Sequence, residues 1–152
     1  MNTWLIKIKE SGKMKISESQ IQKSFFDWVR SRVPHDWRFE LILSTPNQGA
    51  PGAYIHTAKL KAEGLKKGFP DVSVLIPRHG YHSLYFELKT LDGDPSDDQI
   101  KVIKFLNKAG HLAMVISTDR PSKLVKLVQI YLDESLETLQ EYCLDPLIEI
   151  LT

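Results

Sequence analysis

The central part of the chain reads as a strand, a helix and a second strand in direct succession, at residues 83–89, 97–109 and 111–117. A capping box at 96–99, followed by apolar residues at helical spacing, indicates the helix. The apolar residues of this helix, which we expect to face inward, are Ile100, Ile103 and Leu106. Its lysines, which we expect to face outward, are Lys101, Lys104 and Lys108. Because such a crossover joins parallel neighbours, the two strands are predicted to pair in parallel.

A hairpin precedes this unit. Two apolar runs, Val72–Ile76 and Leu84–Leu88, flank a turn at residues 77–80 and predict two antiparallel strands. The other expected elements are helices over 17–33, 54–65 and 121–131 and a strand over 37–43. The first helix begins with a second capping box, formed by Ser17 and Gln20. We therefore expect an α/β fold with a mixed central sheet flanked by helices.

The length of 152 residues and a hydrophobic content of 42% suit one domain with its own core. We expect a single domain over residues 1–152, with its core at about 17–131 and an acidic helical segment at 133–150. No apolar run approaches the roughly 20 residues that cross a bilayer, and no signal peptide is evident. The single cysteine, Cys143, excludes an internal disulfide and a multi-cysteine zinc site. These features predict a soluble, cytoplasmic protein with no membrane partner.

Charge is distributed unevenly along the chain. Residues 1–90 carry 14 basic and 8 acidic side chains, whereas residues 91–152 carry 6 and 11. Phosphates sense charge within about 8–10 Å, so a basic half can attract a polyanion although the net charge is near zero. A mixed, solvated surface would explain the asymmetry equally well. The asymmetry directs the search for chemistry to the first 90 residues.

The residues best suited to chemistry are Asp71, at the start of one hairpin strand, and Glu87, near the end of its partner. Because side chains alternate along a strand, Glu87 and Lys89 should project from one face about 6.6–6.8 Å apart, with Leu88 pointing into the core. Two carboxylates are hard oxygen ligands suited to Mg²⁺ or Mn²⁺. A neighbouring lysine can orient or deprotonate a water, or neutralise charge on a phosphate. The alternative is a surface ion pair worth about 0–1 kcal/mol.

A basic stretch lies just before Asp71. Its lysines, which we predict to contact phosphates, are Lys59, Lys61, Lys66 and Lys67. A solvated helix face is the alternative interpretation. The five histidines lack the spacing of metal ligands, and no serine or cysteine stands in a nucleophile motif.

Ordered sequence blocks give the chain a family resemblance. The blocks are residues 61–71, ending in Gly-Phe-Pro-Asp, residues 81–89, ending in Phe-Glu-Leu-Lys, the capping box at 96–99 and the Pro-Asn-containing loop at 45–49. Together they resemble the VRR-NUC (virus-type replication-repair nuclease) domains of the PD-(D/E)xK nuclease superfamily, over about residues 18–117. The resemblance implies a restriction-endonuclease-like core and a Mg²⁺-dependent endodeoxyribonuclease, with Mn²⁺ as a substitute.

The resemblance also implies roles for single residues. Asp71 and Glu87 match the metal-binding carboxylates, and the backbone carbonyl of Leu88 matches a further metal ligand. Lys89 matches the catalytic lysine. Gln99 resembles a glutamine that the family places near the active site, although a capping-box residue needs no catalytic role.

Two other regions are assigned by the same resemblance. Glu18 resembles the amino-terminal glutamate that completes the metal shell. A first-turn acid favoured by the helix dipole is the alternative, and Glu10 is a weaker competitor. Asn47 and Gln48 lie in the Pro-Asn loop and are expected to contact DNA. The chain departs from the family pattern in its acidic loop at 91–98, which disfavours DNA contacts there.

Stand-alone members of the family resemble small Holliday-junction resolvases. We therefore expect a homodimer that cuts branched DNA to 5′-phosphate and 3′-hydroxyl ends, in a bacterial or phage-infected cytoplasm. One alternative is a non-catalytic nucleic-acid-binding subunit of a replication, repair or packaging assembly. The other is an interaction protein in which the same residues form structural ion pairs.

Overall fold

A computed structural model describes residues 15–45 and 54–152. Its centre is a five-stranded sheet in the order β1-β2-β3-β4-β5. The strands are β1 (Ile42–Ser44), β2 (Val72–Val74), β3 (Leu84–Lys89), β4 (Leu112–Ser117) and β5 (Ile148–Ile150). The strands β3 and β4 pair in parallel, and the other neighbouring pairs are antiparallel. The predicted mixed sheet is confirmed, although β2 ends at Val74 rather than Ile76.

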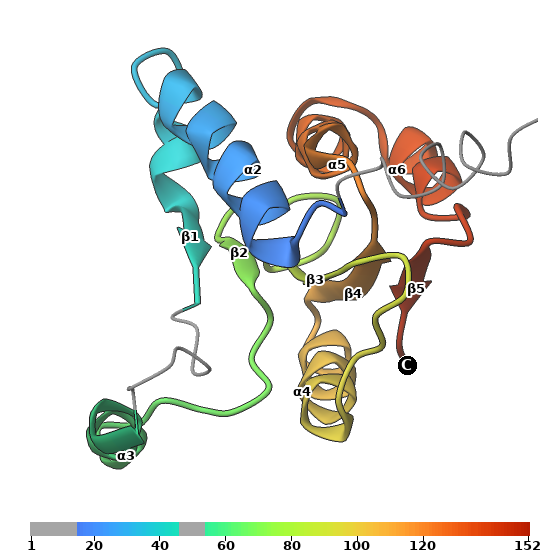
Figure 1. Cartoon of the computed structure of the whole chain (residues 1–152). Helices are drawn as coiled ribbons and strands as arrows, with labels where there is room; N and C mark the ends of the chain where they lie inside the picture. Colours follow the sequence, from blue (N-terminus) through green and yellow to red (C-terminus); the bar gives the residue numbers. More distant parts are fainter. Residues whose placement is uncertain (1–14, 46–53) are drawn as a thin grey trace, which may run out of the picture.

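Helices cover both faces of this sheet (Figure 1). The described helices are α2 (Glu18–Arg32), α3 (Tyr54–Ala62), α4 (Asp97–Lys108), α5 (Pro121–Asp133) and α6 (Leu136–Tyr142), with the 3₁₀ helix η1 (Trp37–Leu41) before β1, and α3 lies apart from the sheet. Helices α2 and α5 pack on one face, and α4 packs on the other. Alternate residues of β3 therefore face different layers, so Phe86 points toward α2 and α5 while Tyr85 points toward α4.

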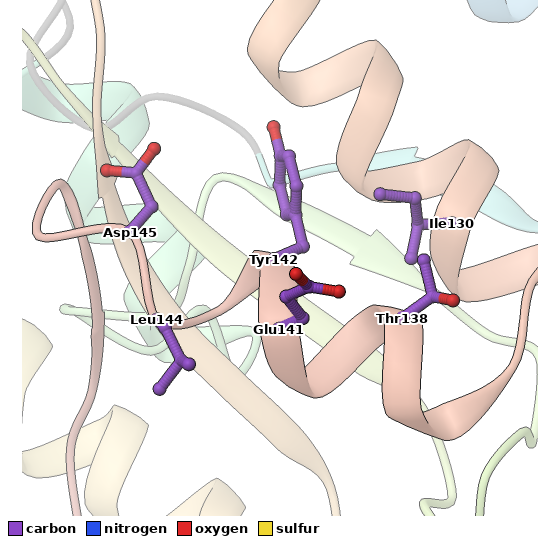
Figure 2. A pocket seen from close by; sticks show the side chains of 6 residues that line it. All are labelled: Ile130, Thr138, Glu141, Tyr142, Leu144 and Asp145. Atoms are coloured by element: carbon purple, nitrogen blue, oxygen red, sulfur yellow. The ribbon is translucent and has the colours of Figure 1, made fainter.

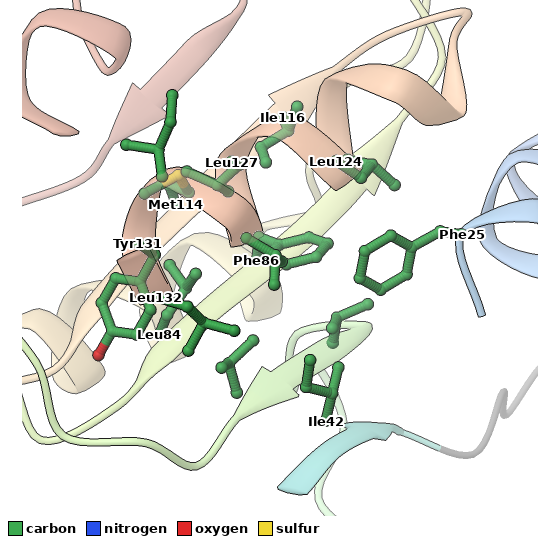
Figure 3. Close-up of a cluster of buried hydrophobic side chains, with 14 of the residues drawn as sticks. Phe25, Ile42, Leu84, Phe86, Met114, Ile116, Leu124, Leu127, Tyr131 and Leu132 are labelled. Carbon is green, nitrogen blue, oxygen red and sulfur yellow. The ribbon is translucent and has the colours of Figure 1, made fainter. Parts of the chain in front are cut away.

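The main core lies between the sheet and the helices α2 and α5 (Figure 3). Phe25 of α2 meets Phe86 of β3 edge-on, with ring centroids 5.7 Å apart. Tyr131 of α5 is fully buried, and its hydroxyl donates to the carbonyl of Ile76 at 2.7 Å. Complete burial of one such side chain contributes about 1.5–3 kcal/mol, so this layer holds β3 rigidly in place.

The ends of the helices follow the sequence signals. Both capping boxes form, Ser17 with Gln20 at α2 and Ser96 with Gln99 at α4. On α4, Ile103 is fully buried, Ile100 and Leu106 are partly buried, and the three lysines are exposed, as predicted.

The strand predicted over 37–43 is wrong for its first five residues. Trp37–Leu41 is a 3₁₀ helix, and the strand begins only at Ile42. The side chain of Asp36 accepts a hydrogen bond from the backbone N–H of Arg38 at 3.0 Å and so caps the helix. The alternation of apolar and polar residues here imitated a strand, although only Phe39 is fully inside.

The acidic segment 133–150 is helical only in part. Helix α6 ends at Tyr142, and residues 148–150 form the edge strand β5 against β4. The backbone N–H of Ser117 donates to the carbonyl of Leu147 at 2.8 Å, which extends the pairing. The predicted helix over the whole segment is therefore wrong. None of the described helices is both long and apolar enough to cross a membrane.

Candidate functional site

The hairpin register brings the predicted acidic residues together. Val72 pairs with Phe86, so Asp71, just before β2, lies across from Glu87 on β3. The carbonyl of Asp71 accepts from the backbone N–H of Thr45 at 2.9 Å. The hydroxyl of Thr45 donates to the carbonyl of Pro70 at 2.6 Å. Two segments far from Asp71 in sequence, at Thr45 and on β3, thus hold its backbone, and the sequence did not indicate this role of Thr45.

Asp71 is held by the neighbouring strand. Its Oδ2 accepts a hydrogen bond from the backbone N–H of Leu88 at 2.8 Å. Burial raises the pKa of Asp71, and the hydrogen bond from Leu88 and the charge of Lys89 oppose this rise. A nearby cation would stabilise the ionised form of such a buried carboxylate.

Glu87 is the most buried charged residue of the site, with 1% of its surface exposed. Its Oε1 accepts hydrogen bonds from Gln99 Nε2 and from Lys89 Nζ, the latter at 2.9 Å. Its Oε2 is buried and has no hydrogen-bond partner among the described residues. Burial, and then the charge of Asp71, raise the pKa of Glu87 to about 7. Because Asp71 and Glu87 are close together and buried, the negative charge of one disfavours ionisation of the other.

Lys89 lies between acidic groups. Its Nζ is 2.9 Å from Glu87 Oε1 and 4.0 Å from Glu18 Oε2. Burial alone would lower the pKa of Lys89, but the hydrogen bond and charge of Glu87, with Glu18 and Asp71, outweigh it and the pKa is raised. Lys89 therefore remains a protonated ammonium group at neutral pH.

Glu18 reaches this cluster from the first turn of α2. Its Oε1 accepts a hydrogen bond from the backbone N–H of Thr90 at 3.2 Å, just after β3. A Cβ on Gly93 would lie 3.4 Å from the same oxygen, so the following turn packs closely around it. The structure places Glu18 beside Lys89 with 42% of its side chain exposed, and its part in a metal shell stays a prediction.

Gln99 connects α4 to the cluster. Its Oε1 accepts from the backbone N–H of Ser96 at 2.8 Å, and its Nε2 donates to Glu87 Oε1. One amide therefore serves as the capping-box partner and as a neighbour of the acidic pair. The capping role of Gln99 is therefore confirmed and the residue lies beside Glu87, while its part in the chemistry stays a prediction.

The acidic residues of the site offer oxygen donors to a divalent cation. No three His, Cys, Asp or Glu side chains converge on a metal-sized position within residues 15–45 and 54–152. Asp71 and Glu87 nevertheless offer carboxylate oxygens at adjoining strand positions, and the buried, unpartnered Glu87 Oε2 is an acceptor without a donor. An all-oxygen set of this kind fits Mg²⁺ or Mn²⁺. The carbonyl of Leu88 as a ligand stays a prediction.

The expected DNA-binding lysines differ in their surroundings. Lys67 pairs with Asp98 at 2.8 Å, and Lys59 lies 3.8 Å from Glu63. Lys61 and Lys66 are exposed. Asn47 and Gln48, like Glu10, lie outside the described residues. The ion pair of Lys67 with Asp98 is exposed, so it neutralises only part of the charge of Lys67 and of the acidic segment 91–98.

The pocket between α5 and α6 is a separate feature (Figure 2). It is shallow and open, with a volume of about 600 Å³, and Tyr142 and Leu144 are among its lining residues. It shares no residue with the acidic cluster, so the chemistry assigned to Asp71 and Glu87 does not depend on it.

Comparisons with known proteins agree with the fold and the blocks around the acidic residues. A solved structure described as a VRR-NUC domain protein superposes with a TM-score of 0.63 at 24% sequence identity, covering 79% of this chain and 91% of that one. A search of curated proteins gave no match. The family model described as the VRR-NUC domain matches residues 8–119. Because this match spans most of the sequence, the chain belongs to the VRR-NUC family, whose domain is of the nuclease type.

Proposed function

We propose that this protein is a divalent-cation-dependent endonuclease of DNA. The observation that carries the proposal is the environment of Glu87, whose Oε2 is buried without a partner while Asp71 and Lys89 lie beside it. A buried acceptor next to a second acid costs free energy unless a cation or a proton neutralises the pair. Asp71 and Glu87 are therefore the proposed ligands of Mg²⁺, for which Mn²⁺ can substitute.

When bound, the cation would act as a Lewis acid, which would polarise the scissile phosphate and lower the pKa of the attacking water. The hairpin register sets Asp71 opposite Glu87, so both carboxylates would be within reach of one cation. Lys89 acts as a donor: its raised pKa keeps the ammonium protonated, so it orients the attacking water and stabilises negative charge developing on the phosphate. Hydrolysis would leave 5′-phosphate and 3′-hydroxyl ends.

Gln99 and Glu18 are proposed as positioning residues. Gln99 fixes Oε1 of Glu87 through its amide, which leaves Oε2 to the cation. Glu18 draws the ammonium group of Lys89 toward α2, since its Oε2 lies 4.0 Å away. Both residues orient groups that would contact the substrate.

Branched DNA is the proposed preferred substrate, and a homodimer is the proposed acting form. Support for both comes from the likeness of the family to small junction resolvases. Two-fold symmetry would set two sites on opposing strands of a four-way junction. Solution mass by light scattering would test the dimer separately from the chemistry.

The test uses labelled linear, flap and four-way-junction DNA with Mg²⁺, Mn²⁺ or EDTA. Wild-type protein should cut in either metal and not in EDTA, and Asp71→Asn or Glu87→Gln should abolish cutting. Glu149→Gln is the matched control, because Glu149 is an exposed acid on β5. Binding without cutting in any metal would indicate a non-catalytic module, and neither binding nor cutting would indicate an interaction protein.

A further inference from the structure

The outer face of α4 carries a basic stripe that the acidic site does not use. Its members, which we call the α4 stripe, are Lys101, Lys104, Phe105 and Lys108. These positions have the spacing i, i+3, i+4 and i+7, so they lie on one side of the helix. The stripe spans about 10 Å, which corresponds to roughly three phosphate steps along one DNA strand.

The lysines of the stripe differ from the other basic residues near the site. Within the described ranges, no carboxylate lies within salt-bridge distance of Lys101, Lys104 or Lys108, whereas Lys67 and Lys15 have acidic partners at 2.8 and 2.5 Å. The hydrogen bond from Lys67 and, to a smaller extent, the charge of Lys101 lower the pKa of Asp98. Lys104 and Lys108 are therefore the least compensated members of the stripe. Their charge is therefore available to a polyanion.

Phe105 adds an apolar element at the centre of the stripe. Its side chain is 56% exposed, and the ammonium group of Lys101 lies 5.9 Å from the ring centroid. Exposed aromatic rings among lysines offer a surface to sugars and unstacked bases, which phosphate contacts alone do not. The combination fits a nucleic acid better than it fits an acidic protein surface.

The position of the stripe relative to the site limits the shape of the DNA. Gln99, which contacts Glu87, and the buried Ile103 mark the inner side of α4, and the stripe lies on the opposite side. A helix with its side chains is about 10–12 Å thick. A straight duplex held at Glu87 would have to bend around α4 to touch the stripe, at a cost of roughly 1–6 kcal/mol.

We propose that the α4 stripe binds the phosphates of a second duplex arm while the first arm lies at the acidic site. This inference rests on the proposed function, because it concerns the same DNA substrate. The arms of branched DNA already diverge, so a junction contacts both surfaces without the bending that a straight duplex requires. The stripe thereby supplies a selectivity for branched DNA that the acidic site alone does not.

The test compares Lys104→Gln/Lys108→Gln with the control Lys23→Gln/Lys126→Gln, which removes two exposed lysines from α2 and α5 on the other face. Affinity for a four-way junction and for a linear duplex is measured by fluorescence anisotropy in EDTA from 50 to 200 mM salt. Losing two phosphate contacts should reduce the slope of log affinity against log salt by about 1.8 for the junction. The linear duplex and the control should show the wild-type slope.

A slope change as small as that of the control, or an equal change on linear duplex, would overturn the proposal. Phe105→Ala should weaken junction binding about threefold or more with the slope unchanged, and equal weakening on linear duplex would count against the second-arm contact.

Cutting of a short linear duplex in Mg²⁺ is recorded in parallel. If the double variant cuts this duplex at the wild-type rate and its junction slope is unchanged, the stripe fails while the proposed function stands. If wild-type protein cuts nothing, the proposed function fails.

Discussion

Gln99 donates a hydrogen bond from Nε2 to Oε1 of Glu87 while its own Oε1 closes the capping box of α4. The start of the helix and the acidic cluster are therefore positioned by one side chain. A change that moves Gln99 in the first turn of α4 should therefore alter the contact with Glu87, which has no other amide donor among its described contacts.

Gln99→Glu tests the two roles separately. A glutamate at this position still completes a capping box, so α4 should keep its first turn, whereas the lost donor and the added charge beside Glu87 should lower the free energy of unfolding by about 1–3 kcal/mol. It removes the donor and places a third acid beside Asp71 and Glu87, so we expect the cleavage rate to fall about tenfold or more. Gln20→Glu, in the matching box of α2, should leave cleavage unchanged. Equal rates for wild type and Gln99→Glu would show that Gln99 is a helix cap only.

The raised pKa of Glu87 predicts how stability depends on pH. Its pKa of about 7 exceeds the ordinary value of 4.5, so folding retains a proton that the unfolded chain has already lost. In EDTA, the free energy of unfolding should fall as pH rises from about 4.5 through 7 and level off above, by on the order of 3 kcal/mol. Asp71, whose pKa is also raised, contributes in the same direction.

Urea unfolding at several pH values, with Glu87→Gln as the comparison, measures this effect. The variant should lack the part of the decline that Glu87 causes. Parallel pH profiles for the two proteins would mean that Glu87 titrates normally in the folded state.

Lys89→Met tests the ammonium group. The side chains have similar length, but methionine donates no hydrogen bond, so single-turnover cleavage should slow by about 10²–10⁴-fold. Binding of DNA should change far less, because one of many charges is lost. Lys126→Met on α5 is the control. A Lys89→Met enzyme with near-wild-type rates would remove Lys89 from the proposed chemistry.

Gly68 tests the contact between the segment before Asp71 and α4. Its φ is +81°, and a Cβ there would lie 2.5 Å from the backbone carbon of Asp98. Gly68→Ala should therefore push this segment away from α4 and destabilise the protein by about 2 kcal/mol or more.

Gly64→Ala provides the matched control. Gly64 also has a positive φ, of +103°, but nothing lies within 4 Å of a Cβ at that position. It should show only the backbone cost, about 1 kcal/mol. Thermal denaturation of both variants decides the point, and equal losses would indicate that the close approach at Gly68 is unimportant.

Much of the fold could be predicted from local signals. The two capping boxes, the hairpin and the crossover each combine an apolar period with a turn or cap, and each forms as expected. Residues 37–41 escaped prediction because Trp37, Phe39 and Leu41 alternate like a strand, whereas the cap from Asp36 favours a 3₁₀ helix. Strand β5 escaped prediction because only its pairing with β4 makes three residues a strand.

The local part of the candidate site could also be predicted from the sequence. The hairpin and the strand alternation, which the sequence indicates, predicted that Asp71, Glu87 and Lys89 lie close together, and the structure brings them together. The long-range contacts were not. The bond from Gln99 to Glu87, the ion pair of Lys67 with Asp98 and the anchoring by Thr45 depend on how helices and loops pack on the sheet.

The most direct test of the central claim is cation binding itself. Bound Mn²⁺ is measured by electron paramagnetic resonance at pH 8 for wild type, Glu87→Gln and the control Glu149→Gln. The account predicts that Glu87→Gln binds Mn²⁺ at least about tenfold more weakly while remaining folded, and that Glu149→Gln binds like wild type. Equal Mn²⁺ affinity in all three proteins would contradict the assignment of the cation to Asp71 and Glu87.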